Sequence, residues 1–576
     1  MVKEYRINTR KREIKVREIN ENELEFGGRG LIAKIMSEEV EPKCDPLGAE
    51  NKFIVCTGLL AGTSVPTAHR LSVGGKSPLT GGIKESNSGG GAGGALARQG
   101  IKMLIFEDKP ADGEWSILVI DKKGNVELKD AGQYIGLNNY KLVELLKDEF
   151  GDDIEVISIG VSGERGYKNS TLQVTEAVTG YPARALARGG MGSVLGSKKI
   201  KAIVISDPEV KYEREFADKE KYNKANQKLK NYMRESEETK RLNRVGTMFN
   251  VDANAPSAAL PVRNFRGEFF EDVDKIDSEA MVKKLNENGG KSGIPCQKGC
   301  LIGCSNIYND KNGNYLTSGL EYETVAMCGA NCDIANLDYL AEISRLCDDI
   351  GLDTIETGST IAICMEAGKI EWGDKEAALG LIKEMKEGTK FGQLLGQGTE
   401  IVGKELGVER IPTVKGQSLP SFDPRNQKGM GVTFATTAMG ADHTTGITLV
   451  IEGMDNMRNT TLVVLSSVMQ SSSATADNMM CLFGWFSLLG SEYIVDVLEG
   501  IYGGEWDMER VIGIGVRTIM MENEFNKKAG FTKEDDRLPD FFYKEKSPAT
   551  GAVFDISQEE ISKVYDNLLV KSMIIY

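Results

Sequence analysis

The chain has 576 residues and a net charge of −15, from 70 basic and 85 acidic residues. An acidic chain disfavours general nucleic-acid binding and attachment to a membrane surface. No apolar run is long enough to span a bilayer, and the first residues, MVKEYRINTRKREIKV, lack a signal-peptide core. We therefore expect a cytoplasmic protein of roughly two to four domains.

Residues 1–207 alternate short β-rich runs with glycine-rich connections. The first residues predict two strands around a turn, and further runs of apolar and β-branched residues predict more strands. The expected strands include EIKVREI (13–19), NKFIVCTG (51–58), KMLIFED (102–108), WSILVID (115–121), IEVISIG (154–160) and IKAIVISD (200–207). This pattern predicts a β-rich N-terminal domain.

Helical periodicity dominates after residue 207. A charged helix is expected in 215–245, and apolar periodicity predicts helices at 337–351, 354–368 and 375–388. Another helical block begins near residue 411. The expected fold class is α+β, with domains at 1–207, 208–410 and 411–576, the last two mainly α-helical.

Two glycine-rich segments in the β-rich region predict an anionic cofactor. SNSGGGAGGALARQG contains a GxGxxG pattern, but the polar residues KESNS precede it where a dinucleotide fingerprint needs an apolar strand. GGKS at 74–77 lacks the first glycine of a P-loop. Backbone N–H groups before a helix start remain available for a phosphate, there and in RGGMGSVLGSKK. The alternative for each segment is a flexible loop.

Three cysteines recur at Cys296, Cys300 and Cys304 in the segment IPCQKGCLIGCSN. This spacing favours an iron–sulfur cluster held by three local thiolates and one remote thiolate. Structural zinc is disfavoured because the paired CxxC spacing is missing. Another alternative is a helix face that packs the three cysteines into a core. Candidates for the fourth ligand are Cys328, Cys332 and Cys481, with the last ranked first.

Several segments, taken in order, resemble the aldehyde:ferredoxin oxidoreductase family. They are FGGRGLIAKIM, DPLGAENKFIVCTGLLAGTSVPTAHRLSVGGKSPLTG, SNSGGG, ARGGMGSVLGSKKIKAIV, the cysteine segment, EYET, DDIGLD and GADH. The resemblance implies a β-rich base for two pterin cofactors that hold tungsten or molybdenum, capped by two helical domains. It also implies a [4Fe–4S] cluster and a magnesium ion.

The resemblance assigns cofactor roles within the β-rich domain. Arg70 would lie between one pterin and the cluster, where a permanent positive charge is suitable. Asn87 and Gly189 would direct backbone carbonyls at the magnesium ion. Gly89 and Arg188 would serve the pterin phosphates.

Two aspartate loops would hold the pterin rings. The DxxGLD loop supplies Asp348, Leu352 and Asp353, and without the resemblance Asp353 is simply expected to cap a helix. In the second loop, Asp477 would contact the other pterin and Cys481 would be the fourth cluster ligand. Asp477 precedes this cysteine by four residues, where the family has five. The cluster motif has one extra residue in its first gap.

The family's active-site residues match Glu323, its neighbour Tyr322, and His443 in GADH. Only two histidines are present, and a lone histidine is usually structural, so the resemblance carries the assignment of His443. It implies that Glu323 relays a proton and that His443 donates a hydrogen bond or a proton to the carbonyl oxygen.

The activity implied is reversible oxidation of aldehydes to carboxylic acids, with electrons passing through the cluster to ferredoxin or a similar carrier. By analogy, the chain forms a homodimer or binds a small electron-transfer subunit. One alternative is the same scaffold acting on an aromatic acyl-thioester or a 2-hydroxy acid. Another is a pterin-free iron–sulfur electron-transfer subunit.

Overall fold

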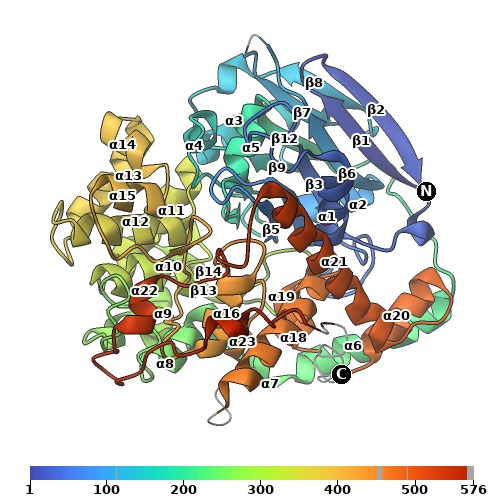
Figure 1. Cartoon of the computed structure of the whole chain (residues 1–576). Coiled ribbons are helices and arrows are strands. Elements are labelled where there is room, and N and C mark those ends of the chain that lie inside the picture. The colour runs from blue at the N-terminus through green and yellow to red at the C-terminus, as the bar shows by residue number, and fades with distance from the viewer. Residues whose placement is uncertain (112, 450–456, 489–490, 567, 569–576) are drawn as a thin grey trace.

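Two six-stranded sheets occupy residues 2–206 of the computed structural model, which describes all residues except 112, 450–456, 489–490, 567 and 569–576 (Figure 1). The first sheet has the order β2-β1-β6-β3-β4-β5. Its strands are β1 (Val2–Asn8), β2 (Glu13–Ile19), β3 (Phe53–Thr57), β4 (Leu71–Lys76), β5 (Ile83–Ser88) and β6 (Ile101–Glu107). Only β1 and β6 pair in parallel.

The second sheet has the order β11-β10-β9-β12-β7-β8. Its strands are β7 (Ser116–Ile120), β8 (Val126–Asp130), β9 (Ile154–Ser158), β10 (Leu172–Val174), β11 (Arg184–Leu186) and β12 (Ile200–Ser206). A shared apolar core joins the two sheets, with side chains from β3, β6, β9 and β12. Burial on both faces explains why these strands read as continuous apolar runs. The strands predicted from such runs are confirmed.

The sequence did not predict β4 and β5, because both are rich in glycine and polar residues although nearly all of their residues are buried. A strand therefore does precede the glycines of 89–94, but it is not the apolar strand that a dinucleotide fingerprint needs. It is the polar edge strand of a sheet, paired antiparallel with β4. The glycines lead into α2 (Ala92–Arg98).

Helices cover the outer faces of the two sheets. The helix α1 packs on β4 and against α21 on one side, and α3 covers the opposite side with an apolar core of its own. The helices of this region are α1 (Gly28–Glu39), α2, α3 (Asn139–Phe150), α4 (Val161–Glu164) and α5 (Met191–Ser197).

The predicted helices after residue 207 are confirmed, with one break. The charged segment forms two helices, because Ser236 ends α6 and its side chain caps α7. The helices up to residue 410 are α6 (Lys219–Glu235), α7 (Glu237–Val245), α8 (Phe249–Asn254), α9 (Ser278–Glu287), α10 (Tyr322–Cys328), α11 (Leu337–Ile350), α12 (Thr354–Glu366), α13 (Lys375–Glu387), α14 (Lys390–Leu395) and α15 (Thr399–Glu405).

A small sheet interrupts this helical part. It consists of β13 (Lys291–Ile294), β14 (Ser305–Asn309) and β15 (Tyr315–Ser318). The three clustered cysteines lie in the connection between β13 and β14, which contains no helix. The alternative that they pack along one helix face is therefore wrong.

The last part begins with a short hairpin, β16 (Thr413–Val414) and β17 (Gln417–Ser418), before helices resume. These are α16 (Lys428–Thr436), α18 (Asn459–Asp477), α19 (Leu482–Phe486), α20 (Tyr493–Tyr502), α21 (Met508–Ala529), α22 (Asp540–Lys544) and α23 (Gln558–Ile561). The α+β fold class is confirmed, whereas the boundary near residue 410 stays a prediction.

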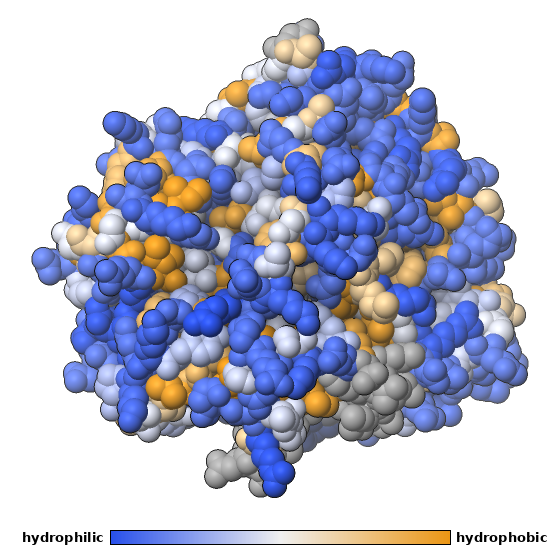
Figure 2. Space-filling model, viewed as in Figure 1, coloured by the Kyte–Doolittle hydropathy of each residue, from blue (hydrophilic) through white to orange (hydrophobic). Residues whose placement is uncertain are grey.

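The face shown in Figure 2 is mostly hydrophilic, with apolar residues in small separate patches. Among the described residues, no helix combines the length and the apolar character needed to cross a bilayer.

Candidate active site

A cavity of about 930 Å³ lies where the β-rich part meets the helical part. Every site residue predicted from the sequence lines this cavity, except Gly189. The predicted residues in the lining are Arg70, Asn87, Gly89, Arg188, Cys296, Cys300, Cys304, Tyr322, Glu323, Asp348, Leu352, Asp353, His443, Asp477 and Cys481. The structure brings them together, and their individual roles stay predictions.

The edge strand β5 divides the wall of this cavity into two halves. It lies beside β11, the edge strand of the second sheet. Side chains alternate along a strand, so Lys84 and Ser86 point to one side and Glu85 and Asn87 to the other. Lys84 and Ser86 contact residues of the Arg188 side, whereas Asn87 contacts Arg70.

Arg70 lies on the Asn87 side, next to the cysteines. Its guanidinium donates to the Asn87 side chain and, at 3.1 Å, to the Asn87 carbonyl oxygen. Burial opposes its charge, but nearby Cys481 and Cys296 raise the pKa of Arg70 above its usual value. Arg70 therefore stays cationic beside the cysteine sulfurs.

The glycine loop after β5 packs directly on the cysteine segment. A Cβ atom at Gly89 would lie 2.6 Å from Cys296 Sγ, so only glycine allows this approach. The Gly90 N–H donates to the Cys296 carbonyl oxygen at 2.9 Å. Remote Cys481 precedes α19, and its own N–H is held by the Thr67 carbonyl oxygen at 3.1 Å.

The other candidates for a fourth ligand lie elsewhere. Cys328 and Cys332 are buried in the helical core, where their thiols contact backbone carbonyls, and neither lines the cavity. Among the described residues, no three His, Cys, Asp or Glu side chains are placed to hold a single metal ion. The cysteines of a cubane bind different irons, so their sulfurs need not converge on one point.

Arg184 is a second arginine beside the cysteines, and no motif in the sequence marks it. It starts β11, lines the cavity, and contacts Glu176 and the Ser305 side chain next to Cys304. Although burial opposes the charge, Glu176 and then Cys296 raise its pKa. The cysteine segment thus lies between two permanent positive charges.

A buried acidic network surrounds Asp477. Its carboxylate lies 3.2 Å from Arg29, whose guanidinium also forms two hydrogen bonds with Glu522. Burial raises the pKa of Asp477 to about 6, although Arg29 opposes the shift. Burial and Asp477 raise the pKa of Glu85 to about 8. The single positive charge of Arg29 thus acts on the carboxyl groups of Glu522, Asp477 and Glu85. This shortage of positive charge favours the protonated form of Glu85.

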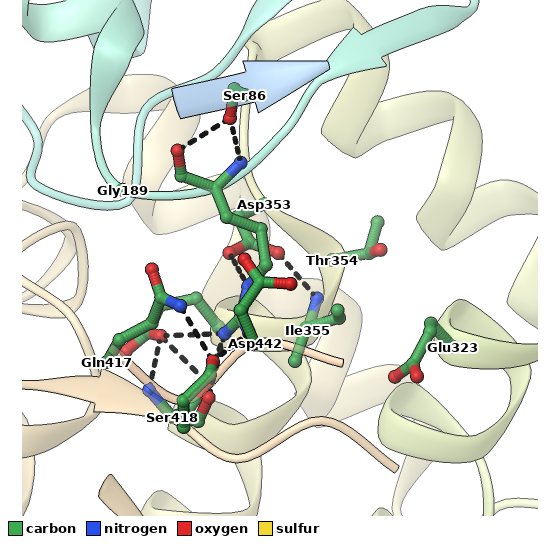
Figure 3. Close-up of polar contacts among 12 residues, drawn as sticks. Ser86, Gly189, Glu323, Asp353, Thr354, Ile355, Gln417, Ser418 and Asp442 are labelled. Carbon is green, nitrogen blue, oxygen red and sulfur yellow. Dashed lines mark hydrogen bonds and ion pairs between the residues drawn. The ribbon is translucent and has the colours of Figure 1, made fainter. Parts of the chain in front are cut away.

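The side chain of Arg188 forms several hydrogen bonds with protein groups. It donates to Asp353 Oδ2 at 3.1 Å, to the Ala441 carbonyl oxygen at 2.6 Å and to the Ser418 carbonyl oxygen at 2.8 Å. Figure 3 shows Asp353, Ser418 and Asp442 converging on this network, with Glu323 to its side. Most guanidinium N–H groups are thus used within the protein, and a phosphate contact by Arg188 stays a prediction.

Asp353 is also the expected helix cap. Its Oδ1 accepts from the Ile355 N–H at 2.9 Å, at the start of α12. Gly351 ends α11 in the left-handed conformation, as the DxxGLD pattern predicts. Asp348 precedes this turn, and burial raises its pKa to about 8. Leu352 forms a backbone bridge with Ser170 in the β-rich part.

Gly189 lies just behind the cavity wall. Its carbonyl oxygen accepts from the Ser77 hydroxyl at 2.7 Å. Its φ of +83° and the stem of Lys84, 2.5 Å from a would-be Cβ, leave room only for glycine.

Glu323 and His443 face each other across the cavity. Glu323 lies in the first turn of α10, and its Oε2 accepts from the Ser421 N–H at 3.0 Å. Its Oε1 lies 3.6 Å from His443 Nδ1. Both of these atoms are buried without a hydrogen-bond partner in the described part of the chain. Such unpaired atoms are free to serve a ligand.

Lys84 anchors the segment that carries His443, and no motif in the sequence marks this lysine. Its ammonium donates to Asp442 Oδ2 at 2.6 Å, and both side chains are almost completely buried. Burial opposes ionisation of Asp442, but Lys84 and Arg188 hold its pKa well below the usual range.

Tyr322 is predicted as a catalytic residue, but its hydroxyl is already occupied. It donates to the Ser421 carbonyl oxygen at 2.5 Å and accepts from the Asn254 amide at 2.8 Å. A structural role fits these contacts better than proton transfer.

Two family models match the chain. One is described as "Aldehyde ferredoxin oxidoreductase, N-terminal domain" and matches residues 4–207. The other is described as "Aldehyde ferredoxin oxidoreductase, domains 2 & 3" and matches residues 224–568. Together they span most of the chain.

Curated relatives include the tungsten-containing aldehyde ferredoxin oxidoreductases of Pyrococcus furiosus and Thermococcus kodakarensis. They are 31% and 32% identical to this chain, and each alignment covers 94% of this chain and 91% of the relative. The solved active site complex BamBC of benzoyl coenzyme A reductase with 1,5-dienoyl-CoA has a TM-score of 0.81. It shares 19% identity over 98% of this chain and 94% of that one, which shows a common fold.

Proposed function

The chain belongs to the aldehyde ferredoxin oxidoreductase family of tungsten-containing oxidoreductases, and from this premise we propose that it oxidises aldehydes reversibly to carboxylic acids. The observation that carries the proposal is the Glu323–His443 pair, whose unpaired atoms lie 3.6 Å apart in the cavity. A ferredoxin or similar carrier, and a cytoplasmic location, belong to the same proposal.

The residues present fit the cofactors that the family implies. Cys296, Cys300, Cys304 and Cys481 line one cavity and supply the four thiolates that a [4Fe–4S] cluster needs. Asp353 and Asp477 lie on opposite sides of β5, where each can bind one pterin ring.

Magnesium would be held by two backbone carbonyls. The carbonyl oxygens of Asn87 and Gly189 each accept one hydrogen bond, from Arg70 and from Ser77. A carbonyl oxygen has two lone pairs, so each keeps one for a cation.

Protein groups around the substrate accept and donate its protons. When bound, the tungsten centre supplies the two-electron oxidation, and the cluster passes the electrons on singly. The Ser421 N–H holds Glu323 Oε2 and leaves Oε1 free to accept a proton. His443 donates a hydrogen bond or a proton to the carbonyl oxygen of the substrate. Such groups typically contribute about 100- to 10,000-fold each.

The test is aldehyde-dependent reduction of a low-potential dye by anaerobically purified protein. Glu323→Gln should lower turnover at least about 100-fold while tungsten and iron content persist. Glu342→Gln, an exposed glutamate on α11, is the matched control. Full activity of Glu323→Gln would remove the carboxylate from the mechanism, and joint loss of activity and metal would make it structural.

A second candidate is reduction of an aromatic acyl-thioester. The shared fold with the benzoyl coenzyme A reductase complex is the observation that favours it. Oxidation of the reduced dye by an aromatic acyl-thioester, in protein that is inert toward aldehydes, would select this alternative.

A further inference from the structure

A chain of four hydrogen-bonding groups runs along the cavity wall beside Glu323. Gln427 donates its Nε2 to Asn254 Oδ1 at 2.6 Å, and Asn254 donates its Nδ2 to the Tyr322 hydroxyl at 2.8 Å. Tyr322 donates to the Ser421 carbonyl oxygen at 2.5 Å. Asn254 and Tyr322 are almost fully buried, so water does not compete for these bonds.

The donor-to-acceptor direction of these hydrogen bonds is fixed at the Ser421 end of the series. A backbone carbonyl oxygen can only accept, so the Tyr322 hydroxyl must donate its proton to Ser421. The tyrosine oxygen must then accept, which requires Asn254 to present its NH₂ group. The Asn254 oxygen is left facing Gln427, which must present its own NH₂ group in turn. The remaining atom, Gln427 Oε1, is therefore an acceptor.

Gln427 Oε1 is an acceptor whose hydrogen bond is not formed within the described part of the chain. It is buried without a hydrogen-bond partner among the residues that the structure describes, and Gln427 lines the cavity together with Glu323 and His443. A buried acceptor left unpaired is costly, so the site favours a ligand that carries a donor. The Asn254–Tyr322 chain prevents the amide from rotating to present a donor instead.

The backbone of the same residue, Ser421, also holds the Glu323 carboxylate. Its N–H fixes Glu323 Oε2 at 3.0 Å, while its carbonyl oxygen anchors Tyr322. The acceptor atom of Gln427 is thereby held at a fixed position relative to the Glu323 carboxylate. The lining of the cavity also includes apolar side chains: Phe249, Phe422, Ile447 and Leu449. A ligand with an apolar body and one donor group matches this wall.

We propose that Gln427 is a specificity-determining residue and that the substrates are aldehydes bearing a hydroxyl or N–H group remote from the carbonyl. The proposal rests on the proposed function for the reaction, but the acceptor position stands on the contacts alone. Gln427 accepts a hydrogen bond from the remote donor group, while Glu323 and His443 exchange protons or hydrogen bonds with the reacting carbonyl group.

The test compares the three hydroxybenzaldehydes with the three methylbenzaldehydes, since a rigid ring directs the group in known directions. One hydroxy isomer should exceed its methyl counterpart in kcat/KM by about 5- to 100-fold, because a methyl group leaves the buried acceptor unpaired. In Gln427→Met this ratio should fall toward one, mainly through KM.

Two further variants separate recognition from general disturbance. Tyr322→Phe removes the hydroxyl that fixes the chain, so it should reduce the hydroxyl-to-methyl ratio while Gln427 remains. Asn426→Ala changes a neighbour that also lines the cavity, but its amide is bonded to Ala258 and Thr550, so the ratio should stay as in the native protein.

Equilibrium binding of the hydroxybenzoates and methylbenzoates is measured in parallel. Aldehyde oxidation without preference for any hydroxy isomer, or with the same preference in Gln427→Met, overturns the proposal and leaves the proposed function intact. Absence of turnover with a Gln427-dependent preference in binding supports the acceptor and contradicts the aldehyde reaction. Absence of both turnover and preference overturns both.

Discussion

Replacing Lys84 with Met should destabilise the metal-free protein by about 3 kcal/mol, because it leaves a buried carboxylate without its counterion. The Lys84 and Asp442 side chains are 1% and 6% exposed and form a 2.6 Å contact. Removing one partner of such a pair costs about 3–5 kcal/mol. The lower end applies because Arg188 also acts on Asp442 and remains in place.

The assay is urea unfolding of native protein, Lys84→Met, Asp442→Asn and the double variant. The double variant should be more stable than Lys84→Met, since it buries no unpaired charge. The depressed pKa of Asp442 contributes stability above the ordinary aspartate pKa of about 4 and loses it as the pH falls through the folded value. The cost of Lys84→Met should therefore shrink in acid. A cost below about 1 kcal/mol at pH 7 would refute the buried pair.

Three further predictions concern the cavity. Cys481→Ser should lower the iron content of the purified protein. The control is Cys364→Ser, which lies outside the cavity and should leave the iron content unchanged. Equal iron content in both variants would exclude Cys481 as a ligand. Arg184→Gln should lower the cluster's reduction potential, measured by redox titration, because a positive charge beside Cys296 stabilises the reduced cluster; an unchanged potential would contradict this. Burial raises the pKa of Asp348 to about 8, so this group weakens the metal-free fold as the pH rises from about 4 to 8. Asp348→Asn should flatten that dependence, and an unaltered profile would show that the folded pKa is ordinary.

The sequence predicted what depends on local patterns. Continuous apolar runs such as 200–206 identified buried strands, and Gly351 with Asp353 correctly ended one helix and began the next. The strands β4 and β5 were missed because most of their residues are polar or glycine, although residues of β5 line the cavity. A polar strand buried at a ligand site leaves no apolar signal.

The site residues that could not be predicted from the sequence contact partners that are distant along the chain. Lys84 pairs with Asp442, 358 positions away, and Gln427 bonds Asn254, 173 positions away. Neither pairing has a period or a spacing that a single sequence reveals. Tyr322 was identified through its motif, but only the structure showed that its hydroxyl is already engaged.

The most direct test of the central claim is the metal and pterin content of anaerobically purified protein, measured together with aldehyde oxidation. We expect about four irons per chain, stoichiometric tungsten, pterin that fluoresces after oxidation, and dye reduction that depends on an aldehyde. Iron without tungsten or pterin, in a host that makes the cofactor, would contradict the enzyme and favour an electron-transfer subunit.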